Sequence, residues 1–232
     1  MALIIPGTTV SQISGRLGGV VFARNRSGSY VRNGTSPITS TTEWATSAKA
    51  RMTAVSQAWQ SLTTAQRTGW GIWAQNNLGT NRLGQPIVLA PHTAYVRCNA
   101  RLMFSADTAI TDPPILPAPA PLSTLVLTAD LGLTTFDVAF TPAALGADDR
   151  LYIRAALVNS AGIDFVENIL KTMPAQAKAT ASPIDLQTMV ETRFGTIQVG
   201  QKLIVEVSVL SSVTGLLSEP LRASAIVVET VI

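Results

Sequence analysis

Residues 14–33 read SGRLGGVVFARNRSGSYVRN, and the rest of the chain is organised around this stretch. The glycines at its start allow backbone conformations that other residues avoid. The apolar residues 20–22 suit an extended, half-buried segment, and Ser27-Gly28 indicates a turn before the pattern resumes at Tyr30. The stretch therefore predicts a glycine-rich hinge followed by a β-hairpin.

The hairpin is strongly basic and carries no acidic residue. Its arginines can contact phosphate groups, since such contacts need only charge and reach, and its tyrosine can stack on a base. They can equally form salt bridges with a neighbouring protein subunit, or simply make a solvated face. We favour subunit contacts, and the candidate partner-binding residues are Arg16, Arg24, Arg26, Tyr30 and Arg32.

The two halves of the chain carry opposite charge. Residues 1–106 contain nine arginines and one lysine against a single acid, Glu43, which gives a net charge of +9. Residues 107–232 contain seven basic and thirteen acidic residues, a net charge of −6. The asymmetry predicts that the first half meets something negative. That can be nucleic acid, or the acidic surface of another subunit, including the C-terminal half of a neighbouring copy.

Three helices are expected after a polar linker at residues 35–42. Apolar residues recur every three or four positions over residues 43–61, which is typical of an amphipathic helix. A second helix, residues 65–77, is capped by Thr63 or Thr64, and a third covers residues 91–106. The first two form an antiparallel hairpin whose core holds the four tryptophans; a sugar-binding platform is the alternative role for these rings. They are Trp44, Trp59, Trp70 and Trp73.

The composition changes at a proline-rich segment, residues 111–121, which predicts a stiff, extended linker. Beyond it, short apolar runs predict an antiparallel β-sandwich with one inserted helix. That helix is expected over residues 183–193, with Ser182 as its N-cap, and Glu206 and Ser208 are expected on the outer face of a strand. The expected strands cover residues 122–128, 134–141, 151–158, 203–210 and 223–231.

These patterns predict an α+β protein in four parts. An N-terminal arm covers residues 1–13. A basic docking domain covers residues 14–112, made of the β-hairpin, the helical hairpin and the third helix. Residues 113–121 form the linker, and residues 122–232 form an immunoglobulin-like β-sandwich.

The chain is poor in residues that carry chemistry. Its single cysteine, Cys98, excludes an internal disulfide, and Cys98 lies about 9 Å along one helix from the single histidine, His92, too far for a nucleophile pair. Residues 15–19 lack the Lys-Ser/Thr ending of a phosphate-binding loop. Adjacent carboxylates such as Asp148 and Asp149, in a loop, are usually solvated. We therefore expect no catalytic residue, no cofactor and no metal.

The N-terminus does not read as a signal peptide, and no apolar run reaches the length of a membrane span. These observations place synthesis in a cytoplasm and predict no membrane partner.

Three features together carry a resemblance: the SG-x-x-GG opening, the basic hairpin RNRSGSYVR, and the helix turn WQSLTTAQRTGW. Over about residues 7–104 the chain resembles small proteins encoded among the structural genes of tailed bacteriophages. The second half is similar, in strand pattern alone, to the immunoglobulin- or fibronectin-like sandwiches often appended to phage head and tail proteins. Its inserted helix and its lack of a core tryptophan depart from the commonest forms.

The resemblance implies a non-enzymatic structural protein located in the virion. It implies a capsid-associated protein, minor or decorating, that binds other virion proteins and is present as a homo-oligomer in the particle. The resemblance leaves two alternatives open. One is a tail or baseplate protein, and the other is a nucleic-acid-binding module that uses the basic N-terminal half.

Overall fold

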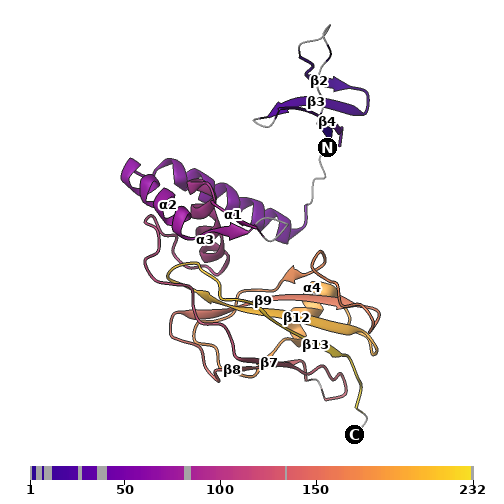
Figure 1. The fold of residues 1–232 in the computed structure, drawn as a ribbon. Helices are drawn as coiled ribbons and strands as arrows, with labels where there is room; N and C mark the ends of the chain where they lie inside the picture. Colours follow the sequence, from indigo (N-terminus) through magenta and orange to yellow (C-terminus); the bar gives the residue numbers. More distant parts are fainter. Residues whose placement is uncertain are drawn as a thin grey trace. The chain divides into compact units, whose positions relative to one another are not determined.

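The computed structural model describes residues 2–3, 7, 12–25, 28–35, 41–80, 85–133 and 135–230 (Figure 1). The chain is an α+β protein, as the sequence predicts. It divides into two compact units, Met1–Thr46 and Ser47–Ile232. The candidate partner-binding residue Arg26 lies outside the described residues.

The first unit holds a four-stranded antiparallel sheet with the order β1-β4-β3-β2. The predicted hairpin is confirmed as β3 and β4. Two further strands join it: β1, from the predicted arm, pairs with β4, and β2 pairs with β3 across a turn in which Gly18 has a φ of 56°. The strands are β1 (Ala2–Leu3), β2 (Gly15–Leu17), β3 (Val20–Asn25) and β4 (Gly28–Asn33).

The three predicted helices are confirmed. Thr63 caps the second through a reciprocal pair of hydrogen bonds with Gln66: the Gln66 N–H donates to Thr63 Oγ1 at 3.3 Å, and the Thr63 N–H donates to Gln66 Oε1 at 3.0 Å. A short two-stranded ladder separates the second and third helices. The elements are α1 (Glu43–Gln60), α2 (Thr64–Asn76), β5 (Gly79–Thr80), β6 (Pro86–Ile87) and α3 (Pro91–Phe104).

An aromatic cluster forms the core of the helical layer. Trp70 is completely buried, its ring centroid lies 5.4 Å from that of Tyr95, and its indole N–H donates to the carbonyl of Thr111 at 2.8 Å. Trp59 and Trp73 pack at the edge of the same cluster. Trp44, in the first turn of α1, was also predicted for this core but is not part of the cluster. It falls within the residue range of the first unit.

The C-terminal part is an antiparallel β-sandwich with an inserted helix, as predicted. One sheet has the order β10-β9-β12-β13 and the other β11-β8-β7, and one apolar core is drawn from strands of both (Figure 1). The elements are β7 (Thr124–Leu127), β8 (Asp137–Thr141), β9 (Asp149–Val158), β10 (Lys171–Thr172), β11 (Ile184–Asp185), α4 (Gln187–Phe194), β12 (Lys202–Ser211) and β13 (Leu221–Ile226).

The inserted helix begins later than predicted. Ser182 is not its N-cap; its hydroxyl instead accepts a hydrogen bond from the Phe140 N–H at 2.8 Å. The next residues form strand β11, in which Ile184 pairs with Val138 of β8. Because these residues pair with the sheet, they form a strand where the sequence predicted the first turn of a helix. The helix α4 therefore begins at Gln187.

The outer face of β12 is not solvated. Glu206 and Ser208 do point away from the sandwich core, but each is only 6% exposed. β12 is a central strand between β9 and β13, and Glu206 accepts hydrogen bonds from Arg154 and Arg222 on those two neighbours. Burial by itself raises the pKa of Glu206, but the hydrogen bonds and charges of the two arginines outweigh it and lower that pKa.

The helical layer and the sandwich belong to one compact unit, whereas the sequence placed a boundary at residues 113–121. The turn after β12 explains the difference. Gly215, with a φ of 69°, lies so close to α3 that a Cβ there would sit 2.4 Å from the Cys98 carbonyl oxygen. Leu216 then packs into the apolar cluster of the helices. These contacts span more than a hundred residues of sequence.

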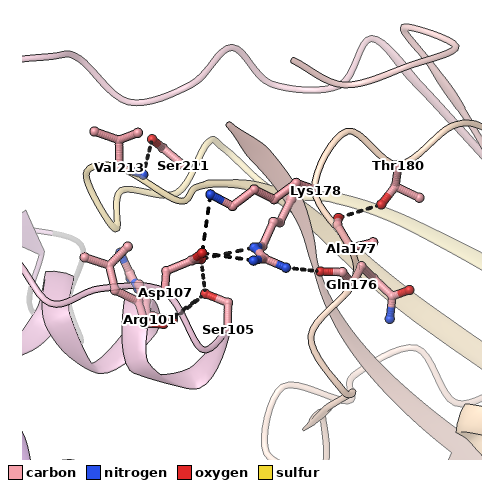
Figure 2. A network of polar contacts seen from close by, with 11 residues as sticks. Arg101, Ser105, Asp107, Gln176, Ala177, Lys178, Thr180, Ser211 and Val213 are labelled. Carbon is pink, nitrogen blue, oxygen red and sulfur yellow. Dashed lines mark hydrogen bonds and ion pairs between the residues drawn. The ribbon is translucent and has the colours of Figure 1, made fainter. Parts of the chain in front are cut away.

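A polar network joins the same two layers (Figure 2). Asp107 lies just beyond the end of α3. The Arg150 side chain, on β9, donates to both of its carboxylate oxygens, at 3.0 and 2.9 Å. Ser105 also donates to Asp107, at 2.9 Å, and Lys178 forms an ion pair with it at 3.5 Å. Burial by itself raises the pKa of Asp107, but these hydrogen bonds and positive charges outweigh it and hold the pKa below its usual value.

Candidate functional site

The register of the N-terminal sheet assigns the candidate residues to its two faces. Arg16 of β2 pairs with Val21 of β3, which pairs in turn with Arg32 of β4. Directly paired residues share a face, and so do residues two apart on one strand. Arg16, Arg32 and Tyr30 therefore lie on one face of the sheet, which we call the basic face. Arg24 lies on the opposite face.

That opposite face carries four apolar residues. Phe22 pairs with Val31, and Val20 pairs with Leu17 on the edge strand. The Leu17 side chain is 76% exposed, and Phe22 and Val31 are only half-buried. We call these four residues the apolar face. The sheet thus has one basic and one apolar face, and Arg24 stands on the same side as the apolar residues.

The described residues of the first unit do not fully cover either face of the sheet. Among the described side chains of residues 1–46, none is fully buried. A small sheet needs a hydrophobic face packed against another layer to be stable in water. The described residues of this unit supply no such second layer.

Three arginines of the sheet lack an acidic partner among the described residues. In the described part of the chain, no carboxylate lies within 4.0 Å of Arg16, Arg24 or Arg32. Arg16 donates from Nε to the carbonyl oxygen of Gly18 at 3.0 Å, which holds its stem along the β2–β3 turn. Exposed guanidinium groups without internal partners are available to an external carboxylate or phosphate.

The residues that the sequence raised for catalysis lie in different surroundings. Cys98 is completely buried, and burial raises the pKa of its thiol to about 11, so it is a protonated core side chain at neutral pH. His92 packs against Trp59, with ring centroids 5.5 Å apart. Burial and the neighbouring charge of Asp148 raise the pKa of Asp149. Within the described ranges, no three His, Cys, Asp or Glu residues cluster as metal ligands would.

The structure also reveals a second polar site. A pocket of about 370 Å³ lies against α3, lined by Arg97 and Arg101 of that helix and by Tyr152 and Arg154 of β9. The spacing of four between the two helical arginines was visible in the sequence and places them on one helix face. Their meeting with β9, about fifty residues later, depends on the packing of helix against sheet.

None of the helices in the described residues is long and apolar enough to cross a membrane.

Comparisons with known proteins add little. No protein-family model matches the chain, and the search of curated proteins found no match. Among solved structures, the chain is similar to an Fn3-like protein from Clostridium thermocellum. The identity is 17%, the TM-score is 0.28, and the match covers 50% of this chain and 98% of that one.

Proposed function

We propose that this protein is a non-enzymatic structural component of a tailed-bacteriophage particle, associated with the capsid as a minor or decorating subunit. Its N-terminal sheet docks on neighbouring virion subunits. The β-sandwich then projects from the particle or contacts a neighbour. The assignment to a phage particle rests on the resemblance of residues 7–104 to phage structural proteins.

One observation carries the docking role. Among its described residues, the N-terminal sheet has no fully buried side chain and no acidic partner for Arg16, Arg24 or Arg32. A partner that covers the apolar face removes Leu17, Phe22 and Val31 from water, and this burial supplies the affinity. Carboxylates of the partner opposite Arg16 and Arg32 set the orientation more than the affinity. The partner is therefore a protein surface with an apolar patch and acidic residues.

The basic face also favours a second candidate function. Two arginines and a tyrosine on one face of a sheet are the groups that bind single-stranded nucleic acid, by phosphate contacts and base stacking. A nucleic-acid partner would use Arg16, Tyr30 and Arg32 but leave the apolar face uncovered. The two functions therefore differ in which face of the sheet they use.

Fractionated virions test the proposal. Purified particles, separated into heads and tails, should contain the protein in heads at high copy number by quantitative mass spectrometry. Its absence from particles would overturn the proposal, and confinement to tails at low copy number would replace the capsid role by a tail or baseplate role.

Variants of the two faces separate docking from nucleic-acid binding. Leu17→Ser with Phe22→Ser should abolish incorporation into particles, whereas Arg16→Glu with Arg32→Glu should reduce it. Neither pair should change the unfolding of residues 47–232. Salt-sensitive binding of single-stranded DNA, lost in the arginine pair and kept in the apolar pair, would instead favour the nucleic-acid function.

A further inference from the structure

The pocket against α3 lies within the second unit. Its floor is the outer face of β9 and β12, where Ser208 is only 6% exposed. One wall is α3, and another is the segment from Leu217 to Pro220 that leads into β13. Its volume, about 370 Å³, is in the range of sites that hold small molecules.

The charges around the pocket do not cancel locally. Arg154 is engaged by Glu206, which Arg222 also neutralises. Arg97 and Arg101, by contrast, have no carboxylate within 4.0 Å among the described residues. Glu219 also lines the pocket but forms no ion pair with either of them. With Arg154 and Glu206 paired, the pocket therefore has two positive charges, Arg97 and Arg101, and one negative charge, Glu219.

Arg101 is the group most in need of a partner. Its hydrogen bond to the chain, from Nη1 to the carbonyl oxygen of Gly215, is long, at 3.4 Å. Burial and the like charge of Arg97 lower the pKa of Arg101 from its usual value. Its place in the last turn of α3 offsets part of this cost through the helix dipole. An anion held between the two guanidinium groups would offset the remainder.

Hydroxyl groups add the second element of an anion site. The Ser208 hydroxyl makes no hydrogen bond within the described part of the chain, and it lines the pocket. The Tyr152 hydroxyl is 3.3 Å from Thr172 Oγ1, so it retains capacity for another bond. Guanidinium forks bind the paired oxygens of phosphate and carboxylate, and hydroxyls complete such contacts.

We propose that the pocket binds a small anion bearing a phosphate or carboxylate group, held between Arg97 and Arg101 with the Ser208 hydroxyl as a further donor. The site is independent of the docking sheet. A small molecule rather than a polypeptide is its occupant, because the pocket is bounded by α3, the sheet and the 217–220 segment.

Calorimetric titration of the full-length protein tests this site, with inorganic phosphate and citrate as separate probes at constant ionic strength. Binding of either probe by the wild-type chain, with affinity at least about tenfold weaker in Arg101→Gln and in Arg97→Gln, is the expected result. Preference for one probe then distinguishes a phosphate from a carboxylate ligand. Failure of both probes to bind at millimolar concentration would overturn the proposal.

Two further variants keep the test decisive. Lys49→Gln removes the same charge from the exposed surface of α1 and should leave the affinity unchanged; an equal loss there would mean nonspecific attraction and reject the site. Ser208→Ala reports on the pocket if Arg101→Gln does not fold, which far-ultraviolet circular dichroism will show. Unchanged affinity in both Ser208→Ala and Arg97→Gln would also reject it.

Discussion

The N-terminal sheet and the α3–sandwich junction use the same residue type in opposite ways. In the sheet, Arg16 and Arg32 have no carboxylate within reach among the described residues. At the junction, Arg150 is 16% exposed and makes a bidentate contact with Asp107, itself 7% exposed. The comparison teaches that an arginine paired with a buried carboxylate can join two layers of one unit, whereas arginines without such a partner are available to another molecule.

Burial separates the same two regions. The junction places Gly215 against the backbone of Cys98, and the sandwich encloses Phe136 completely. The described part of the N-terminal sheet encloses nothing. We therefore expect substitutions in the core of the second unit to lower its free energy of unfolding strongly. Substitutions in the N-terminal sheet should leave that free energy unchanged.

Matched phenylalanine substitutions should show the largest contrast. Phe136→Ala leaves a cavity between the two sheets and should lower the free energy of unfolding by about 4 kcal/mol. Phe22→Ala, in the N-terminal sheet, should change the same transition by less than about 0.5 kcal/mol. Chemical denaturation followed by tryptophan fluorescence measures both, because Trp70 reports on the second unit. Similar losses in the two variants would break the comparison.

The turn against α3 should show the next largest effect. Gly215→Ala places a Cβ 2.4 Å from the Cys98 carbonyl oxygen and should cost about 3 kcal/mol, from the displaced turn and the positive φ together. Gly200→Ala is the matched control: its φ is 86°, but no atom lies within 4 Å of the new Cβ. It should cost only about 1 kcal/mol. Equal costs in a urea titration would mean that the contact with α3 contributes nothing.

Removing the charge of Asp107 should lower the free energy of unfolding by the least of the three destabilising changes. The size of this loss should depend on pH. Asp107→Asn should cost about 2 kcal/mol at neutral pH, since it weakens hydrogen bonds from a charged donor. Because the folded pKa of Asp107 is lowered, its contribution is complete above the unfolded value of about 3.9 and is lost as the pH falls through the folded pKa.

The stability difference between wild type and Asp107→Asn should therefore shrink below about pH 4, as measured by denaturant titration at a series of pH values. Glu229→Gln, at an exposed carboxylate near the end of the sandwich, is the control and should change little at any pH. A difference that stays constant down to pH 2 would show that the ionised carboxylate does not hold the junction.

Local sequence signals predicted the elements but not where some of them belong. Thr63 and Gln66 carry the capping box of α2 in their own side chains, so that helix start could be read directly. Ser182-Pro183 carries an equally good helix signal, yet these residues precede strand β11 because β8 offers backbone partners there. Propensity is a weak prior, and tertiary pairing overrides it.

The candidate site shows the same limit. The sequence identified the basic hairpin, but it could not assign Arg24 to one face and Arg32 to the other without the register of β3 with β4. It showed the four-residue spacing of Arg97 and Arg101 but not the pocket they share with Tyr152, because that pocket exists only where α3 meets β9.

The sequence by itself determined the α+β class, the hairpin, the three helices, the sandwich and the opposite charges of the two halves. All of these follow from periodicity, turn residues and composition, which act over a few neighbouring positions. Only the tertiary structure decided that the helices and the sandwich form one unit and that Glu206 is buried. It also decided which arginines are paired. Those outcomes depend on contacts such as Gly215 with Cys98, between residues that no local pattern relates.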